Sequence, residues 1–130
     1  MKKFYVASSF QNTEAVRFIS EQLKNKGFVQ TYDWTKNNRA STIEELKEIG
    51  QKEKKAVMEA DFLIVLLPAG KGSHIELGIA LGQGKRIYLY SQSKEVINPE
   101  TTSTFYHLAD VEIVIGTMDE LLTKVTNSKN

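Results

Sequence analysis

The chain has 130 residues, which is enough for one domain with a core of its own. Hydrophobic residues make up 41% of it and charged residues 25%, as in an ordinary soluble globular protein, and the formal net charge of +1 gives no electrostatic reason to expect a nucleic-acid partner. No apolar run is long enough to cross a membrane, and the N-terminus lacks the apolar region of a secretion signal, so we expect a cytoplasmic protein.

The sequence contains few residues that could support metal or thiol chemistry. The chain has no cysteine, and its histidines are His74 and His107. Disulfides and thiolate chemistry are therefore excluded, and a zinc site would depend on histidine and carboxylate ligands alone. We accordingly expect no metal centre.

The first part of the chain alternates between an expected strand and an expected helix. Phe4 to Ser8 is short and nearly all apolar, which is typical of a central strand. A polar connection follows, and Asn12 or Thr13 can cap a helix that Gly27 ends. The second strand is expected at Phe28 to Tyr32.

A longer helix is expected from residue 41 to about residue 60. It opens with Ser41-Thr42-Ile43-Glu44, which has the S-x-x-E spacing of a capping box. Residues that recur every three or four positions then form a stripe with the period of a core-facing helix surface. The stripe consists of Leu46, Ile49, Gly50, Glu53, Val57 and Ala60. Glu53 is thus a carboxylate on an otherwise apolar face.

The middle of the chain has the pattern of a strand, a glycine turn and a helix. Phe62 to Pro68 is apolar throughout, as in a parallel strand that is buried on both faces. The turn at residues 69–72 leads to a helix that we expect to start at Ser73, carry Glu76 and end before Gly84. A glycine turn followed by a helix N-terminus is where open α/β sheets bind ligands.

The last third of the chain contains two further strands. The first is expected at Arg86 to Tyr90, followed by a polar loop over Ser91 to Ser103 and a helical turn at Thr104 to Leu108. The second strand is expected at Val111 to Ile115. Thr117 then starts the final helix with another S/T-x-x-E spacing.

Five strands that alternate with helices predict a parallel sheet covered on both faces. We expect an α/β fold over residues 1–130: a single three-layer, flavodoxin-like (Rossmann-like) sandwich with strand order 2-1-3-4-5. In that order the C-terminal ends of the first and third strands are neighbours, and ligands bind at this switch point. Residues 5–10 would then lie beside residues 68–76, with the Asp33-Trp34 loop at the rim.

Glu76 at this point has two interpretations. Ser73-His74-Ile75-Glu76 is itself a capping box, so the carboxylate can simply satisfy the backbone of the helix N-terminus. Alternatively, the helix dipole lowers its pKa and keeps it ionised, which suits a nucleophile.

Glu53 also has two interpretations. Its side chain can reach outward to water or pair with a lysine. Otherwise, burial on the apolar stripe raises its pKa, which suits a general acid. Two carboxylates whose environments push their pKa values apart are the pattern of a glycosyl-transfer site, where one is the nucleophile and the other the acid. This chemistry needs neither a metal nor an organic cofactor.

Other side chains at the expected site are candidates for contacts with a substrate. A tyrosine in the first strand can hydrogen-bond a carboxylate or simply pack in the sheet. Two aromatic rings can stack on a flat ring or serve as rim contacts, and serine hydroxyls can bind a hydroxyl or phosphate or merely cap and turn the chain. These candidates, with the turn glycines, are Tyr5, Ser8, Ser9, Phe10, Trp34, Gly70, Gly72 and Ser73.

Two well-known nucleotide-binding motifs are absent from the sequence. The first strand is followed by Ala7-Ser8-Ser9-Phe10 in place of a G-x-G-x-x-G fingerprint. The chain also has no G-x-x-x-x-G-K-S/T loop. Rossmann-type dinucleotide binding and P-loop chemistry are therefore excluded.

Three segments resemble the nucleoside 2-deoxyribosyltransferase family, which includes relatives that hydrolyse the N-glycosidic bond of deoxynucleoside monophosphates. The segments are the opening FYVASSF, the strand EADFLIVLL and the segment GSHIELGIALGQGKRIYLY. They cover the first strand and most of the middle of the chain, and the likeness is weaker from Ser91 onward.

The resemblance implies roles for three residues. The glutamate of the family's ELG motif, its nucleophile, corresponds to Glu76, and the tyrosine that orients the nucleophile corresponds to Tyr5. The acidic residue that handles the leaving base, usually Asp, corresponds to Glu53. Six residues before the nucleophile, the transferases carry Asp and the monophosphate hydrolases Ser, whereas this chain has Gly70.

The resemblance also implies an activity and an assembly. The activity would be cleavage or exchange of the N-glycosidic bond of a (deoxy)nucleoside or its monophosphate. At least a dimer is implied, because a neighbouring subunit often completes the family's sites, here through Ser103, Thr104 or Tyr106. Two rival interpretations remain open: a TIR-like hydrolase that releases nicotinamide from NAD through a glutamate, and a non-catalytic nucleotide-binding or sensing module.

Overall fold

The computed structural model describes residues 2–127, which form a five-stranded parallel sheet between two layers of helices. Its order is β2-β1-β3-β4-β5, and every neighbouring pair is parallel. The α/β architecture and the strand order expected from the sequence are confirmed. The strands are β1 (Lys3–Ala7), β2 (Val29–Gln30), β3 (Phe62–Leu66), β4 (Arg86–Ser91) and β5 (Val111–Ile115).

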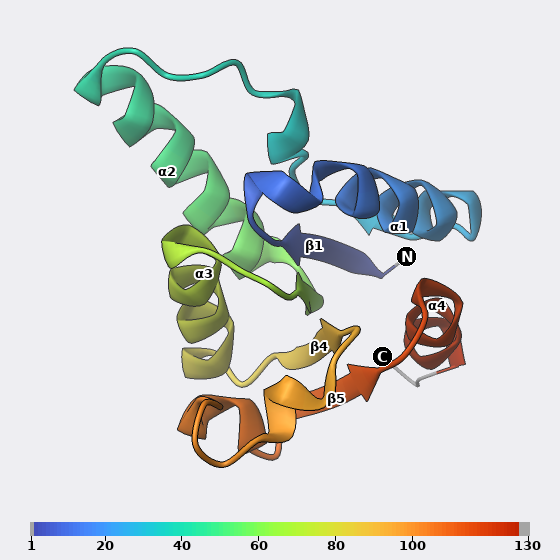
Figure 1. Cartoon of the computed structure of the whole chain (residues 1–130). Helices are drawn as coiled ribbons and strands as arrows, with labels where there is room; N and C mark the ends of the chain where they lie inside the picture. The colour runs from blue at the N-terminus through green and yellow to red at the C-terminus, as the bar shows by residue number, and fades with distance from the viewer. Residues whose placement is uncertain (1, 128–130) are drawn as a thin grey trace.

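Helices cover both faces of the sheet. Figure 1 shows α2 and α3 on one face and α1 and α4 on the other. Within residues 2–127 the α-helices are α1 (Thr13–Asn25), α2 (Ile43–Glu59), α3 (Lys71–Gly82) and α4 (Met118–Asn127). The connections contain the 3-10 helices η1 (Phe10–Asn12), η2 (Trp34–Lys36), η3 (Lys94–Ile97) and η4 (Thr104–His107). Thus the segment 91–103, expected to be loop, includes one short helix.

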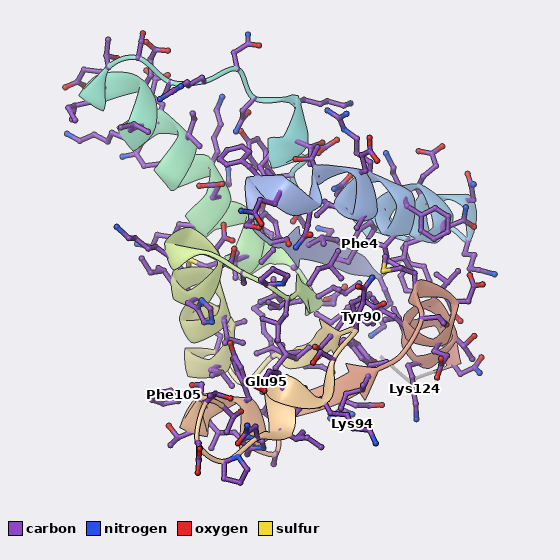
Figure 2. All side chains as sticks on the ribbon, viewed as in Figure 1. Phe4, Tyr90, Lys94, Glu95, Phe105 and Lys124 are labelled. Atoms are coloured by element: carbon purple, nitrogen blue, oxygen red, sulfur yellow. The ribbon has the colours of Figure 1, made fainter. Side chains whose placement is uncertain are left out.

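The core is centred on β3, whose five residues are all buried. Each large apolar side chain buried in this way contributes roughly 1.5–3 kcal/mol relative to an exposed one. On the face toward α1 and α4, the ring of Phe62 stacks on Phe4 at a centroid distance of 6.3 Å and meets Tyr88 edge-on at 5.7 Å. Phe4 lies inside the molecule in Figure 2, whereas Phe105 lies at its periphery. Neighbouring strand residues alternate between faces, so Tyr5 points toward α2 and α3.

Several element boundaries differ from the expected ones by one to three residues, and β2 and the cap of α2 are examples. β2 contains only two residues, although the Thr31 N–H still donates to Phe4 O of β1 at 2.9 Å. Beyond it, the Tyr32 hydroxyl donates to Asn37 Oδ1 at 2.8 Å. The cap of α2 lies one residue later than expected. Thr42 Oγ1, rather than Ser41, accepts the hydrogen bond of the Glu45 backbone N–H at 3.1 Å.

The expected apolar stripe of α2 faces the core over only part of its length. The second half buries Ala56 and Val57, but Leu46 is exposed and Ile49 is only half-buried. Length explains the difference: seventeen helical residues span about 25 Å, and five-residue strands about 17 Å. The first half of α2 consequently extends past the sheet, as Figure 1 shows.

The start of α4 has the expected reciprocal capping box. Glu120 N–H donates to Thr117 Oγ1 at 3.1 Å, while Thr117 N–H donates to Glu120 Oε1 at 3.1 Å. The two bonds satisfy backbone donors that the helix leaves unpaired. They fix the start of a helix that buries Leu121 and Val125 against the sheet.

Replacing Thr117 with Ala should therefore lower the free energy of unfolding by about 1 kcal/mol, measured by urea denaturation. Thr123→Ala is the matched control, because Thr123 is exposed in the middle of α4. It should leave the stability within about 0.5 kcal/mol of the native protein. Equal losses in the two variants would contradict the capping role of Thr117.

Candidate active site

The site is centred on a buried hydrogen bond between the sheet and α3. Tyr5, in the middle of β1, lies in register with Leu63 of β3. Its hydroxyl donates to Glu76 Oε2 at 2.6 Å. Tyr5 has no exposed surface and the exposed fraction of Glu76 is 8%. The structure thus brings together two residues that are 71 positions apart in the sequence.

Glu76 does not cap α3. The helix begins at Lys71 with Gly70 at the N-cap position, two residues earlier than expected, and no side chain caps it. Ser73 is the third residue of the helix, so the predicted Ser73–Glu76 capping box is wrong. Glu76 instead lies in the second turn, where its carboxylate faces Tyr5.

The pKa of Glu76 is raised to about 7. Burial is the largest cause, the hydrogen bond from Tyr5 acts in the opposite direction, and the negative charge of Glu53 raises the pKa further. The expected lowering by the helix dipole is wrong, because the effect of the dipole falls off within the first turn and Glu76 lies beyond it. Burial also raises the pKa of Tyr5 far above its usual value, so Tyr5 remains a neutral donor.

Glu53 approaches the same site from α2. It is half-buried, and burial raises the pKa of its carboxyl group, as expected for its place on the stripe. Its charge acts on both Tyr5 and Glu76. The negative charge of Glu53 thus opposes ionisation of Glu76.

The serines after β1 connect the ends of β1 and β3. Ser8 Oγ donates to Leu66 O at 2.7 Å, and Ser9 Oγ donates to Pro68 O at 3.2 Å. Asn12 Nδ2 donates to Ser8 Oγ at 2.9 Å and to Pro68 O at 3.0 Å. The expectation that the Asn12 side chain caps α1 is wrong. Asn12 and Pro68 are 56 positions apart in the sequence, so no local pattern indicates their contact.

The two aromatic candidates lie in contact but differ in exposure. Trp34 is buried, and its indole N–H donates to Val6 O at 2.7 Å. Phe10 is 78% exposed and meets Trp34 edge-on at a centroid distance of 5.5 Å. Trp34 therefore supports Phe10, and Phe10 is the ring that a ligand can reach.

The start of α3 offers open space beside the backbone. A Cβ atom built on Gly70 or Gly72 would meet no heavy atom within 4 Å. Ser73, by contrast, is buried. The backbone at these glycines is therefore accessible to a ligand.

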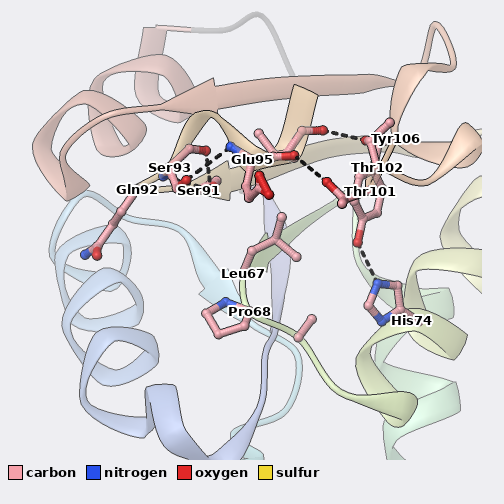
Figure 3. Close-up of a pocket in the computed structure, with 12 residues that line it drawn as sticks. Leu67, Pro68, His74, Ser91, Gln92, Ser93, Glu95, Thr101, Thr102 and Tyr106 are labelled. Carbon is pink, nitrogen blue, oxygen red and sulfur yellow. Dashed lines mark hydrogen bonds between the residues drawn. The ribbon is translucent and has the colours of Figure 1, made fainter. Parts of the chain in front are cut away.

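A cavity of about 500 Å³ lies beside the site, where β3 and β4 end (Figure 3). Leu67 to Ala69 form one wall, and Ser91 to Val96 contribute another. His74 and Tyr106 meet at its edge, with His74 Nε2 2.7 Å from the Tyr106 hydroxyl. No pattern in the sequence points to His74, because its partner lies 32 positions away. Tyr106, a candidate for a neighbouring site, contacts its own chain here.

A metal-ligand cluster and a membrane-spanning helix are both absent from the part of the chain that the structure describes. Residues 2–127 contain no group of three or more His, Asp or Glu side chains that could hold a metal ion. Within the same range, no helix is both long and apolar enough to pass through a bilayer.

The fold is shared with several solved structures. A CMP N-glycosidase of Clostridium botulinum, BcmB, is 23% identical with a TM-score of 0.64, and the match covers 98% of this chain and 100% of that one. A conserved protein of Enterococcus faecalis V583 is 16% identical with a TM-score of 0.69, covering 97% and 98% of the two chains. BlsM is 16% identical with a TM-score of 0.63, covering 95% and 85%. No curated protein matches the chain in sequence.

The family assignment rests on the sequence as a whole. The model of the family described as nucleoside 2-deoxyribosyltransferase matches residues 4–127, which include the four α-helices and, apart from Lys3, the five strands described above. The resemblance inferred from three segments is thereby confirmed. The chain belongs to the nucleoside 2-deoxyribosyltransferase family.

Proposed function

We propose that this protein cleaves or transfers the N-glycosidic bond of a (deoxy)nucleoside or its monophosphate through a covalent intermediate on Glu76. The observation that carries the proposal is the buried hydrogen bond from Tyr5 to Glu76, with the carboxyl group of Glu53 on the facing helix. A buried carboxylate held by one fixed donor is preorganised to attack. Family membership and the fold shared with a CMP N-glycosidase support the same chemistry.

In the first step, an oxygen of Glu76 forms a bond to the anomeric carbon of the sugar, and the bond from that carbon to the base breaks. Glu53 donates a proton to the departing base. The transition state is rich in positive charge on the sugar, which the carboxylate of Glu76 stabilises. Tyr5 holds Glu76 in place through its 2.6 Å hydrogen bond.

In the second step, water or another base attacks the anomeric carbon, and the bond to Glu76 breaks. Glu53, now ionised, takes the proton of the attacking group. The choice of attacking group decides between hydrolysis and transfer. Phe10, the exposed ring next to the site, is the proposed stacking partner of the base. Ser8 and Ser9 donate to the carbonyl groups of Leu66 and Pro68 and so position the backbone that the substrate contacts.

The active form has Glu76 ionised and Glu53 protonated. Because the pKa of Glu76 is about 7, only part of the protein has this proton arrangement near neutral pH. Both carboxyl groups therefore shape the pH dependence of the reaction rate.

As in other family members, we propose a homodimer or larger assembly, in which Ser103 or Thr104 of one copy reaches the site of another.

Replacing Glu76 with Gln should abolish base release, lowering kcat by at least about 10³-fold, because the amide is a poor nucleophile. Chromatography of free base after incubation with nucleosides and their monophosphates measures this. Mass spectrometry of the rapidly quenched native protein should find a glycosyl adduct on the peptide that contains Glu76. Glu59→Gln, at an exposed position of α2, serves as the control and should retain activity. Full base release by Glu76→Gln, or nicotinamide release from NAD alone, would refute the proposal.

Replacing Glu53 with Gln should slow cleavage in proportion to how much protonation the leaving base requires. For ordinary bases we expect a loss of about 10²–10⁴-fold in kcat, the usual contribution of a general acid. For a substrate whose leaving group departs without a proton, the variant should approach the native rate. A uniform loss across leaving groups would show that Glu53 is not the acid.

Tyr5→Phe and Glu53→Gln should shift the acid limb of the pH–rate profile in opposite directions. The Tyr5 hydroxyl lowers the pKa of Glu76, so its loss should move the limb to higher pH and reduce activity about tenfold or more at pH 6. The charge of Glu53 raises the pKa of Glu76, so its removal should move the limb to lower pH. Shifts of the same sign in the two variants would contradict these assignments.

A further inference from the structure

Arg17 joins α1 to the short helix that carries Trp34. The Arg17 Nε atom donates to Thr35 Oγ1 at 3.2 Å, and its Nη2 atom donates to Thr35 O at 3.0 Å. Both bonds come from one planar guanidinium group, a geometry that the single nitrogen of a lysine cannot reproduce. These two bonds to one residue hold η2 against α1, and Figure 1 shows the two helices side by side.

Hydrogen bonds inside η2 connect Thr35 to the residue before Trp34. The Thr35 hydroxyl accepts from Arg17 and donates to Asp33 Oδ1, which also accepts the Thr35 backbone N–H at 3.0 Å. Asp33 thereby caps the start of η2. A hydroxyl that donates and accepts at the same time strengthens both of its bonds. Arg17, Thr35 and Asp33 therefore form one continuous network on both sides of Trp34 in the chain.

Trp34 lies between this network and the exposed ring of Phe10. Its indole N–H donates to Val6 O, which fixes the indole ring at the end of β1. The Phe10 ring meets the indole ring at an interplanar angle of 90°. Because Trp34 is buried and most of Phe10 is exposed, the contact with Trp34 restricts a ring that otherwise faces solvent. The position of Phe10 thus depends on the position of η2.

We propose that Arg17 is a positioning residue for recognition of the base: it fixes η2, and through Trp34 it fixes the Phe10 ring on which the base stacks. This inference rests on the proposed function for the role of Phe10. Arg17 itself does not contact the substrate. A ring that is already fixed loses less conformational entropy when a ligand binds, so the network raises the affinity for the base.

Titration of the native protein with the free bases adenine, guanine, cytosine and thymine tests this without any bond cleavage. Trp34 is the single tryptophan of the chain, so a change in its fluorescence reports binding beside it. At least one base should bind. Phe10→Ala should weaken this binding about 5- to 150-fold, the usual range for a base stacked on an aromatic ring. Arg17→Met should weaken it about 3- to 10-fold, as expected for the loss of hydrogen bonds that hold η2.

A double variant separates positioning from a general structural effect. If Arg17 acts through Phe10, Arg17→Met should cause no further loss of binding in the Phe10→Ala protein. Thr35→Val removes the hydroxyl and should weaken binding as Arg17→Met does, whereas Thr35→Ser keeps the hydroxyl and should bind normally. Lys24→Met is the matched control, because it removes another exposed positive charge from α1, and it should bind bases like the native protein.

Three results would overturn the proposal. They are the failure of all four bases to bind, unchanged binding by Arg17→Met, and losses in Arg17→Met and Phe10→Ala that simply add in the double variant. Absence of base release from nucleosides by the native protein would instead refute the proposed function and leave these binding results valid.

Discussion

The hydrogen bond between Tyr5 and Glu76 joins the centre of the sheet to the helix that carries the proposed nucleophile. Burying a carboxyl group is costly unless it has a partner, and Tyr5 supplies that partner from a strand with no exposed surface at this position. The same burial raises the pKa of Glu76 to about 7, where a small change in surroundings alters its charge. The position and the protonation of Glu76 therefore both depend on this contact.

The parallel sheet explains why the parts of the site meet. β1 and β3 are adjacent and end at the same edge, so Ser8, Ser9 and Asn12 can bond to the end of β3. The buried strand β3 fixes where α3 begins, and α2 packs beside α3 on the same face. In the proposed mechanism, this arrangement places one carboxyl group on each of two neighbouring helices, with Tyr5 on the sheet beneath them.

The fold could be predicted because its signals are local. Apolar runs such as Phe62 to Pro68, together with glycines and helix periods, specify alternating elements, and the alternation specifies the sheet. The strand order also placed Tyr5 near Glu76, but the bond from Asn12 to Pro68 and the pairing of His74 with Tyr106 could not be predicted in this way. The predicted lowering of the Glu76 pKa was wrong, because α3 starts two residues earlier than expected. Glu76 therefore lies beyond the first turn, where the dipole has little effect and burial raises the pKa.

Burial, opposed by one hydrogen bond, sets the charge of Glu76. Carbon-13 NMR of the protein with labelled glutamate carboxyl groups tests this directly, with the Glu76 signal assigned by its absence from the Glu76→Gln variant. We predict that the Glu76 carboxyl group titrates with a midpoint near pH 7. A midpoint near 4.5, the ordinary value for glutamate, would show that Glu76 is not held in the buried contact with Tyr5 and would contradict the account.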